Sequence, residues 1–299
     1  MHVDIGGVKI HFDVDGVKES LESGVLIEKP TVVMIHGGPG SDHHFCMPIG
    51  RPLTELAQVV YIDLRGHGNS DRSSPEHWNL QTWADDVAGL CHALGIHRPI
   101  VLGFSFGGFV AQALAIRHPE SVGRLILCST SARIDPALVE DAFRRRGGDA
   151  VGSAAAAFLE DPTDPARADR YRALCLPLYS TSSAQFGLQS LAGGRWDQDI
   201  FDWYVRPIDG EFHTADFSQR LVDVTAPTVI IAGALDPITP PEAAQSLHKA
   251  FAPGIARLEV LDAASHTLYL DAERPFFDLL RSVVQEAAAE ASPPGRIQP

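Results

Sequence analysis

Residues 103–108 read GFSFGG and follow the apolar run PIVL at 99–102. A short apolar run that ends in glycines is typical of a buried strand turning into a helix. A nucleophile on such a turn adopts strained backbone angles and needs small residues two positions before and after it. Gly103 and Gly107 meet that need around Ser105, and Gly108 lets the helix begin close to the strand. We therefore predict that Ser105 is a nucleophile on a strand-to-helix turn.

The pattern G-x-S-x-G alone is weak evidence, because average residue usage produces it by chance about 0.1 times in a chain this long. A plain glycine-rich turn is the alternative, and the surrounding sequence decides between the two. Helix patterns alternate with short buried-strand patterns before and after the motif, as expected for a mostly parallel sheet covered by helices on both faces. The expected strands lie at 8–14, 31–37, 58–66, 99–105, 122–130, 226–233 and 256–263, and the expected helices at 79–95, 107–118, 240–251 and 275–290.

This alternation stops near Arg133 and resumes after about residue 220. The segment between them is helical in pattern, irregular and rich in aromatic residues. A segment that leaves a sheet and then rejoins it indicates an inserted helical cap. We predict an α/β core of residues 1–132 and 221–290, a cap of residues 133–220, and a disordered tail at 291–299.

Composition narrows the class of protein further. The 299 residues are 45% hydrophobic with a formal net charge of −14. An acidic surface disfavours nucleic acid and anionic membranes as partners and leaves a small molecule. The N-terminus lacks an apolar signal core, no apolar run is long enough for a membrane span, and the four cysteines form no CxxC pair. We expect a cytoplasmic protein with reduced thiols, and the sequence leaves a homo-oligomer open.

A serine nucleophile needs a base, and the base needs an acid that holds its tautomer. His266 follows the last expected strand, where a loop returns over the carboxyl ends of the sheet. Asp236 follows another buried strand at the same end. The order serine, aspartate, histidine is the one that α/β hydrolases use. We therefore predict a triad of Ser105, His266 and Asp236, and activity that fades below about pH 6.5 as the base becomes protonated.

The other histidines fit catalysis less well. His67 lies in a tight loop that it is expected to hold together. His43 and His44 lie near His36, but no carboxylate or cysteine completes a metal-ligand spacing, so no metal site is predicted. The turn HGGPG at 36–40 offers backbone N–H groups for an oxyanion. Gly38 is the expected donor, together with the N–H of Phe106; a purely structural glycine turn is the alternative.

Five motifs together resemble the α/β-hydrolase superfamily: HGGPG (36–40), DLRGHGNS (63–70), GFSFGG (103–108), LDPITPP (235–241) and SHTLYLDAERP (265–275). HGGPG is similar to the opening motif of the proline iminopeptidase-like branch. The resemblance spans about residues 5–285. It implies an eight-stranded, mostly parallel sheet with a lid, acyl-enzyme hydrolysis without a cofactor, and the same triad and oxyanion residues. Members with an aspartate nucleophile are disfavoured because position 105 is serine.

The sequence departs from aminopeptidases of that branch in the residues that recognise the substrate. They recognise a free amine with carboxylates from the cap and beside the catalytic acid, but here Pro237 follows Asp236. Asp209 and Glu211 remain as candidate cap acids, although a solvated charged loop is the simpler interpretation. Burying the substrate's ammonium group with too few carboxylate partners would cost on the order of several kcal/mol of binding free energy. The alternatives are thus an esterase or lactonase, an aminopeptidase that releases N-terminal proline, and a non-catalytic receptor on the same fold.

We favour the first of these: a serine hydrolase that cleaves a small, largely apolar ester or lactone. Its predicted substrate contacts are Phe104, Trp196 and Trp203, with Glu211 as a candidate polar contact. The cap aromatics have the alternative role of packing in the cap core.

Overall fold

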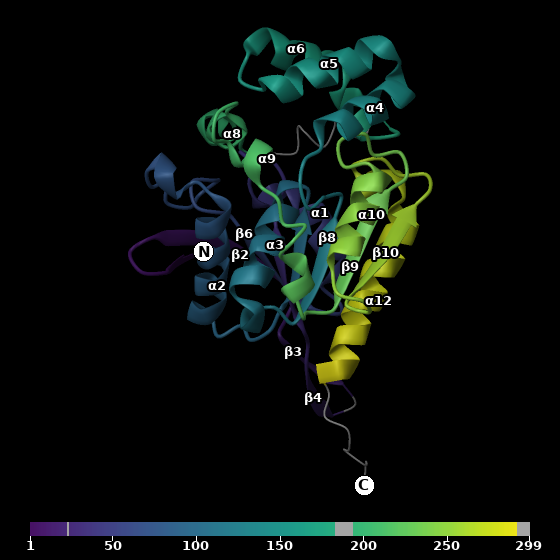
Figure 1. Cartoon of the computed structure of the whole chain (residues 1–299). Coiled ribbons are helices and arrows are strands. Elements are labelled where there is room, and N and C mark those ends of the chain that lie inside the picture. The colour runs from purple at the N-terminus through teal and green to yellow at the C-terminus, as the bar shows by residue number, and fades with distance from the viewer. Residues whose placement is uncertain (23, 183–193, 292–299) are drawn as a thin grey trace.

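The computed structural model describes residues 1–22, 24–182 and 194–291. Its centre is an eight-stranded sheet with the strand order β1-β2-β6-β5-β7-β8-β9-β10 (Figure 1). β2 pairs antiparallel with β1 and β6, and every later pair in that order is parallel. The strands are β1 (His2–Asp4), β2 (Lys9–Asp15), β3 (Glu19–Glu22), β4 (Val25–Glu28), β5 (Thr31–Ile35), β6 (Gln58–Ile62), β7 (Ile100–Phe104), β8 (Arg124–Cys128), β9 (Thr228–Gly233) and β10 (Ala256–Leu261).

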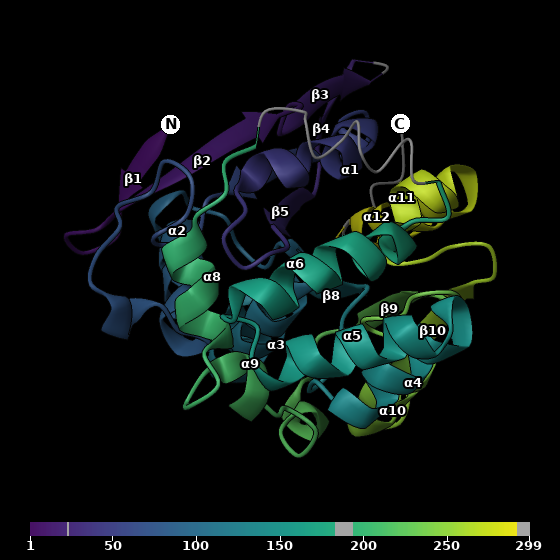
Figure 2. The ribbon, with the colours of Figure 1, turned by 90° about the horizontal axis from the view of Figure 1, so that it is seen from above.

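Helices cover both faces of the sheet, as the predicted strand–helix alternation requires (Figure 2). Successive side chains of a strand point to opposite faces, so the central strands contribute to two separate cores. Val33 and Val101 pack with α2, α3 and α10, whereas Met34 and Leu102 pack with α1 and α12. The helices around the sheet are α1 (Met47–Gly50), α2 (Leu80–Ala93), α3 (Phe106–Arg117), α10 (Pro241–Ala250), α11 (Leu268–Asp271) and α12 (Glu273–Ala291).

A second group of helices lies over the carboxyl ends of the strands, at the top of Figure 1. Those within residues 136–174 have a small core of their own around Phe143, Leu159 and Tyr171. Ile200 and Tyr204, farther along the chain, pack instead into the core on one face of the sheet. The chain leaves the sheet and returns at nearly the same point, because the N–H of Phe217 donates to the Ala132 carbonyl at 3.0 Å. We call residues 133–220 the cap. Within its described residues, 133–182 and 194–220, the cap has the helices α4 (Pro136–Gly147), α5 (Asp149–Glu160), α6 (Pro165–Leu174), α8 (Gln198–Val205) and α9 (Glu211–Thr214).

The predicted strands and helices are present at the expected places, with Asn79 as the N-cap of α2 accepting from the Thr82 N–H at 2.8 Å. The sequence analysis missed the hairpin of β3 and β4, which pairs outside the main sheet. Its apolar side chains face solvent, and Leu21 is 73% exposed, so no buried-strand pattern marks it. The short 3-10 turns were also missed: His43–Phe45, Arg51–Leu53, Pro75–His77, Pro119–Ser121, Leu176–Tyr179 and Leu221–Asp223. The predicted tail, apart from Ala291 in α12, lies outside the described residues.

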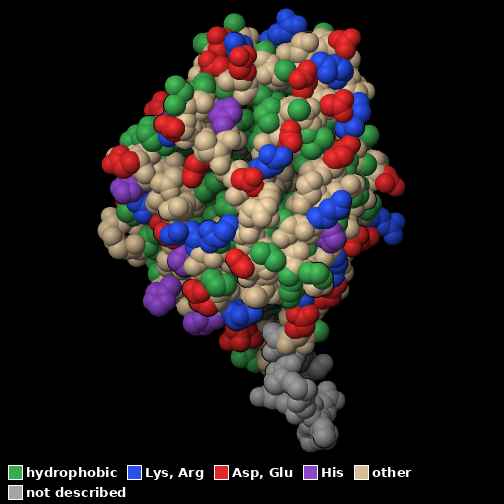
Figure 3. Space-filling view, in the orientation of Figure 1, with side chains coloured by type: hydrophobic (Ala, Val, Ile, Leu, Met, Phe, Trp, Pro, Cys, Tyr) green, Lys and Arg blue, Asp and Glu red, His purple; other side chains and the backbone are tan. Residues whose placement is uncertain are grey.

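All four cysteines are free thiols with buried side chains, in agreement with the reduced thiols expected from the sequence. On the face in Figure 3, acidic and basic side chains are interspersed with apolar ones. Within the described part of the chain, no helix combines the length and apolarity that a membrane crossing needs.

The turn from β7 into α3 depends on glycines at which the backbones nearly touch. A Cβ on Gly103 would lie 2.4 Å from the Gly107 carbonyl oxygen, and a Cβ on Gly107 would lie 2.3 Å from the Ile35 carbonyl oxygen. A Cβ on Gly108 would lie 2.5 Å from the Thr130 side chain. These distances are far below van der Waals contact, so the steric roles predicted for the three glycines agree with the packing.

Gly107→Ala is therefore expected to push α3 away from β5 and to lower the free energy of unfolding by about 1–3 kcal/mol or more. Gly89→Ala is the matched control, because its Cβ would meet Ile5 at an ordinary 3.4 Å inside α2, where alanine favours the helix. Urea unfolding of the two variants measures the difference. Equal stability of both would contradict the steric argument.

Candidate active site

Ser105 lies between β7 and α3 with φ 54° and ψ −117°. A positive φ is unfavourable for any residue with a Cβ and persists only where the surrounding packing enforces it. Here the Ser105 N–H donates to the Cys128 carbonyl at 2.9 Å, and the glycines on either side admit the close approach. This conformation presents the serine Oγ at the carboxyl edge of the sheet, 3.0 Å from His266 Nε2.

Asp236 lies on the loop after β9 and contacts the other nitrogen of the same imidazole. Its Oδ2 is 2.8 Å from His266 Nδ1, while its Oδ1 accepts from the Ile238 and Thr239 N–H groups at 2.9 and 3.0 Å. The Thr239 hydroxyl also donates to Oδ2 at 2.6 Å. The structure thus brings together the three residues predicted from distant parts of the sequence, with a carboxylate held by four donors.

Thr239 was missed by the sequence analysis. The signal was available, since an aspartate whose oxygens accept from residues two and three positions later makes an Asx-type turn, and D-P-I-T at 236–239 suits one.

His266 lies on the loop between β10 and α11, with only 5% of its surface exposed. Its backbone carbonyl accepts from the Ser129 hydroxyl at 2.8 Å. The ring is held edge-on between Phe104 and Tyr179, with centroids 5.6 and 5.0 Å away. Backbone and ring are therefore both fixed, which holds the two ring nitrogens toward Ser105 and Asp236.

The predicted oxyanion donors lie on two neighbouring loops. Gly38 follows β5 in a loop where it adopts φ +118°, a conformation that favours glycine. Phe106 is the first residue of α3, and the first N–H groups of a helix have no partner within it. The helix also directs its positive end toward this edge of the sheet. Both backbone positions suit an anion that develops next to Ser105.

The HGGPG loop is packed against the returning end of the cap. The Asp197 N–H donates to the Gly40 carbonyl at 2.7 Å, and the Arg195 N–H donates to Asp42 Oδ2 at 2.8 Å. A Cβ on Gly40 would lie 2.6 Å from the Asp197 carbonyl oxygen, so this glycine lets the two segments touch. The position of the HGGPG loop is thus tied to that of the cap.

The predicted substrate contacts occupy different environments. Phe104 is fully buried and packs on Phe45, His266 and Tyr269, so it supports the imidazole instead of forming an open wall. Trp196 is 54% exposed and lies against Gly40 of the HGGPG loop.

Trp203 lines an outer depression of about 540 Å³ with Arg72, Trp78 and Arg206. Its ring lies under the Arg206 guanidinium at 4.0 Å. None of the described residues that line this depression belongs to the predicted triad.

Glu211 has a role that the sequence did not indicate. Its Oε2 accepts from the Leu80 N–H at 2.6 Å and so closes the N-terminus of α2. Burial raises the pKa of this carboxyl, partly offset by the hydrogen bond from Leu80. The solvated-loop interpretation is therefore wrong for Glu211, which is partly buried, and it holds for Asp209, which is exposed.

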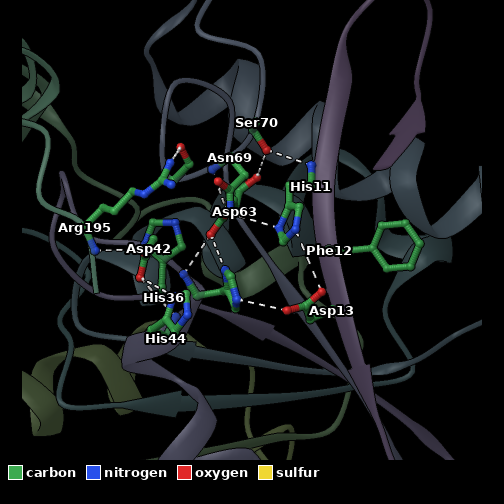
Figure 4. Close-up of polar contacts among 12 residues, drawn as sticks. His11, Phe12, Asp13, His36, Asp42, His44, Asp63, Asn69, Ser70 and Arg195 are labelled. Atoms are coloured by element: carbon green, nitrogen blue, oxygen red, sulfur yellow. Dashed lines mark hydrogen bonds and ion pairs between the residues drawn. The ribbon is translucent and has the colours of Figure 1, made fainter. Parts of the chain in front are cut away.

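A cluster of polar side chains lies beside the HGGPG loop, on β2 and after β6 (Figure 4). Asp63 Oδ1 is 2.7 Å from His43 Nδ1, and its Oδ2 is 3.2 Å from His11 Nδ1. Burial alone would raise the pKa of Asp63, but hydrogen bonds from His43 and from the Asn69 N–H outweigh it and hold that pKa well below its usual range. Burial would lower the pKa of His43, yet the hydrogen bond and charge of Asp63 raise it.

This cluster corrects the premise that no carboxylate lies near His43. His11, His43 and Asp63 offer ligand atoms within 4.8 Å of one another, although they are far apart in the sequence. Both oxygens of Asp63 already accept hydrogen bonds, from His43 at 2.7 and 2.8 Å and from the Asn69 N–H at 2.9 Å. These contacts fasten the segment that follows the HGGPG loop to β2 and to the end of β6.

His67 is enclosed behind Phe106, as its predicted structural role requires. Its ring packs on Trp83 and Phe106, and its Nδ1 is 3.1 Å from the Arg65 carbonyl oxygen. Burial, assisted by the neighbouring His36, lowers the pKa of His67 to about 3. This imidazole is therefore neutral at physiological pH and has no contact with Ser105 through which to act as a base.

Comparison with known proteins agrees with this architecture. Residues 30–273 match the family model described as alpha/beta hydrolase fold. The chain belongs to the α/β-hydrolase family. It is thus an enzyme of the hydrolase class, and the resemblance seen in its motifs is confirmed.

Similar proteins cover nearly the whole chain. The proline iminopeptidase PfmaB of Pestalotiopsis fici is 28% identical over 90% of this chain and 93% of its own length. The pimeloyl-[acyl-carrier protein] methyl ester esterase of Neisseria meningitidis is 29% identical over 85% and 93%, respectively. Among solved structures, an N-acyl homoserine lactone degrading enzyme has a TM-score of 0.72 at 25% identity, with 94% of this chain and 99% of that chain covered.

The buried neutral state of His67 predicts how stability depends on pH. The folded pKa lies below the unfolded value of about 6.5, so the unfolded chain takes up a proton first and stability falls as pH drops from about 6.5 toward 3. Each pH unit in this range costs up to about 1.4 kcal/mol for this residue. Denaturant unfolding at several pH values should give a shallower acid slope for His67→Gln than for the wild type. Parallel slopes would show that His67 does not contribute.

Proposed function

We propose that the protein is a serine hydrolase that cleaves a small carboxylic ester or lactone through an acyl-enzyme on Ser105. The observation that carries the proposal is the continuous relay from Ser105 Oγ to His266 Nε2 at 3.0 Å and from His266 Nδ1 to Asp236 Oδ2 at 2.8 Å. A hydroxyl becomes a useful nucleophile when a base accepts its proton and an acid stabilises the imidazolium that forms. Each of these roles has one residue here.

The reaction proceeds in two halves. Ser105 Oγ attacks the ester carbonyl while His266 Nε2 takes the hydroxyl proton, and Asp236 stabilises the resulting imidazolium. As the tetrahedral intermediate collapses, the carbon–oxygen bond breaks and the imidazolium returns the proton to the leaving alkoxide. Water then attacks the acyl-enzyme with His266 as base, which releases the acid and restores Ser105. With a lactone, the alcohol and the acid are two ends of one product.

The oxyanion of each intermediate is assigned to the N–H groups of Gly38 and Phe106. Fixed donors at such a position typically contribute about 2.7–4 kcal/mol each to the barrier reduction. Two sets of contacts support a fixed position for the HGGPG loop. Gly40 and Asp42 accept hydrogen bonds from the cap, and Asp63 contacts the ring of His43 just after the loop. A donor that does not reorganise during the reaction is what this form of catalysis requires.

The contacts that carboxylates of the cap already make favour an ester or lactone over an N-terminal peptide as the substrate. Recognition of a free ammonium requires carboxylates that are not already committed. Glu211 accepts the Leu80 N–H, Asp197 is paired with Arg72, and Pro237 stands beside the predicted catalytic acid. The esterase and lactone-degrading relatives are consistent with this preference. The similarity to PfmaB keeps a proline iminopeptidase as the second candidate.

Among the predicted substrate contacts, Trp196 is the best supported, because it lies against the HGGPG loop and retains an exposed face. Substrate contacts from Phe104 and Trp203 remain predictions. The buried ring of Phe104 would have to become accessible to the substrate, and the ring of Trp203 would have to turn away from the outer depression.

Ser105→Ala is expected to lower kcat by about 10³-fold or more, because it removes the nucleophile. Thermal unfolding should stay within a few degrees of the wild type, since only a hydroxyl is removed. Release of p-nitrophenol from p-nitrophenyl acetate measures the loss. Retained turnover by the folded variant would show that another group carries the reaction.

Substrate class is tested by comparing p-nitrophenyl acetate with proline p-nitroanilide at equal concentration. We expect the ester to have the larger kcat/KM, because Glu211 and Asp197 are already committed to other partners and are not available for the proline ammonium. N-acetylproline p-nitroanilide is the matched control, since it lacks the free amine. Efficient release from proline p-nitroanilide alone would replace the esterase proposal with the aminopeptidase.

A further inference from the structure

Arg146, in the last turn of α4, reaches from the cap onto both loops that carry the base and acid of the proposed triad. Its Nη1 donates to the Leu178 carbonyl at 2.8 Å, to the Ser265 hydroxyl at 2.7 Å and to the Leu235 carbonyl. Leu178 belongs to the cap. Leu235 and Ser265 directly precede Asp236 and His266 in the chain. One guanidinium nitrogen therefore contacts three separate segments.

The hydroxyl of Ser265 completes the same junction. Its Oγ lies 2.6 Å from the Leu178 carbonyl and 3.2 Å from the Leu235 carbonyl, and the residue is fully buried. Arg146 and Ser265 thus share two carbonyl acceptors, so that neither loop can shift without breaking contacts to the other. A planar guanidinium holds several acceptors at once with little loss of side-chain entropy per bond.

The cap also binds the far side of the His266 loop. The N–H and hydroxyl of Thr267 both donate to the Tyr179 carbonyl, at 3.0 and 3.1 Å. Asp271 accepts from the Thr181 N–H at 2.9 Å and from the Ser265 N–H at 2.8 Å. His266 is therefore bracketed on both sides, at positions 265 and 267, by residues fastened to the cap segment 178–181.

We propose that Arg146 is a positioning residue, which sets the geometry of Asp236 and His266 through Leu235 and Ser265 and so links the cap to the chemistry. The proposal rests on the proposed function of that site. Arg146 makes no contact with Ser105 among the hydrogen bonds of the described residues, so its effect is expected in kcat and not in substrate affinity.

The test compares Arg146→Met with Arg145→Met. Arg145 is the neighbouring residue on α4 and also links cap to core, through a 2.9 Å ion pair with Glu242 on α10, but it contacts neither loop of the proposed triad. We expect Arg146→Met to lower kcat for p-nitrophenyl acetate by about tenfold or more, with KM within about twofold of the wild type. Arg145→Met should keep the wild-type kcat.

A lysine variant separates positioning by hydrogen bonds from the effect of charge. Arg146→Lys keeps the cation, but its shorter side chain cannot bring a donor to the three acceptors with the same geometry. We therefore expect kcat to remain reduced in Arg146→Lys while KM stays near the wild-type value. A contact that serves stability alone would leave kcat of the folded variants unchanged.

Equal kcat values for Arg146→Met and Arg145→Met would overturn the proposal. If Arg146→Met does not fold, Ser265→Ala replaces it, and a kcat unchanged from the wild type would overturn the proposal equally. Labelling of the wild type and of Ser105→Ala with a fluorophosphonate makes the two failures distinguishable. Labelling that persists in Ser105→Ala rejects the proposed function itself, whereas Ser105-dependent labelling at the same rate in Arg146→Met rejects only the role of Arg146.

Discussion

The close contact between the backbones of β5, β7 and α3 is the constraint on which the rest of the site depends. Ser105 can hold a positive φ because Gly103 and Gly107 permit carbonyl oxygens where a Cβ would stand. That approach also brings the N-terminus of α3 to the edge of the sheet, next to the HGGPG loop. The positions of the proposed nucleophile and of the proposed oxyanion donors are thus consequences of one packing arrangement.

The cap contacts this edge of the sheet along two separate seams. On one side, Arg195 and Asp197 hold the HGGPG loop through Asp42 and Gly40. On the other side, the segment 178–181 and Arg146 hold the loops of Asp236 and His266. The cap therefore shares hydrogen bonds with the HGGPG loop and with the loops of Asp236 and His266, instead of resting on the sheet as an independent cover.

Most of the core could be predicted from the sequence because its signals are local. The apolar strands, the N-cap at Asn79 and the glycines around Ser105 each depend on neighbouring residues, and their order along the chain sufficed to select Asp236 and His266. The roles of Arg146, Glu211 and Asp63 could not be predicted in this way. Each depends on a partner at least 20 residues away in the chain. The exposed hairpin of β3 and β4 carries no burial pattern at all.

The burial of every cysteine has a consequence for how the enzyme withstands oxidation. Cys46, Cys91, Cys128 and Cys175 are all enclosed, and burial raises the pKa of the Cys91 and Cys175 thiols to about 12. Peroxides react with cysteines that are both deprotonated and accessible, and the four buried thiols of the folded chain meet neither condition. The backbone carbonyl of Cys128 accepts the hydrogen bond from the Ser105 N–H. Burial of the Cys128 thiol therefore protects the residue that holds the Ser105 backbone from oxidation.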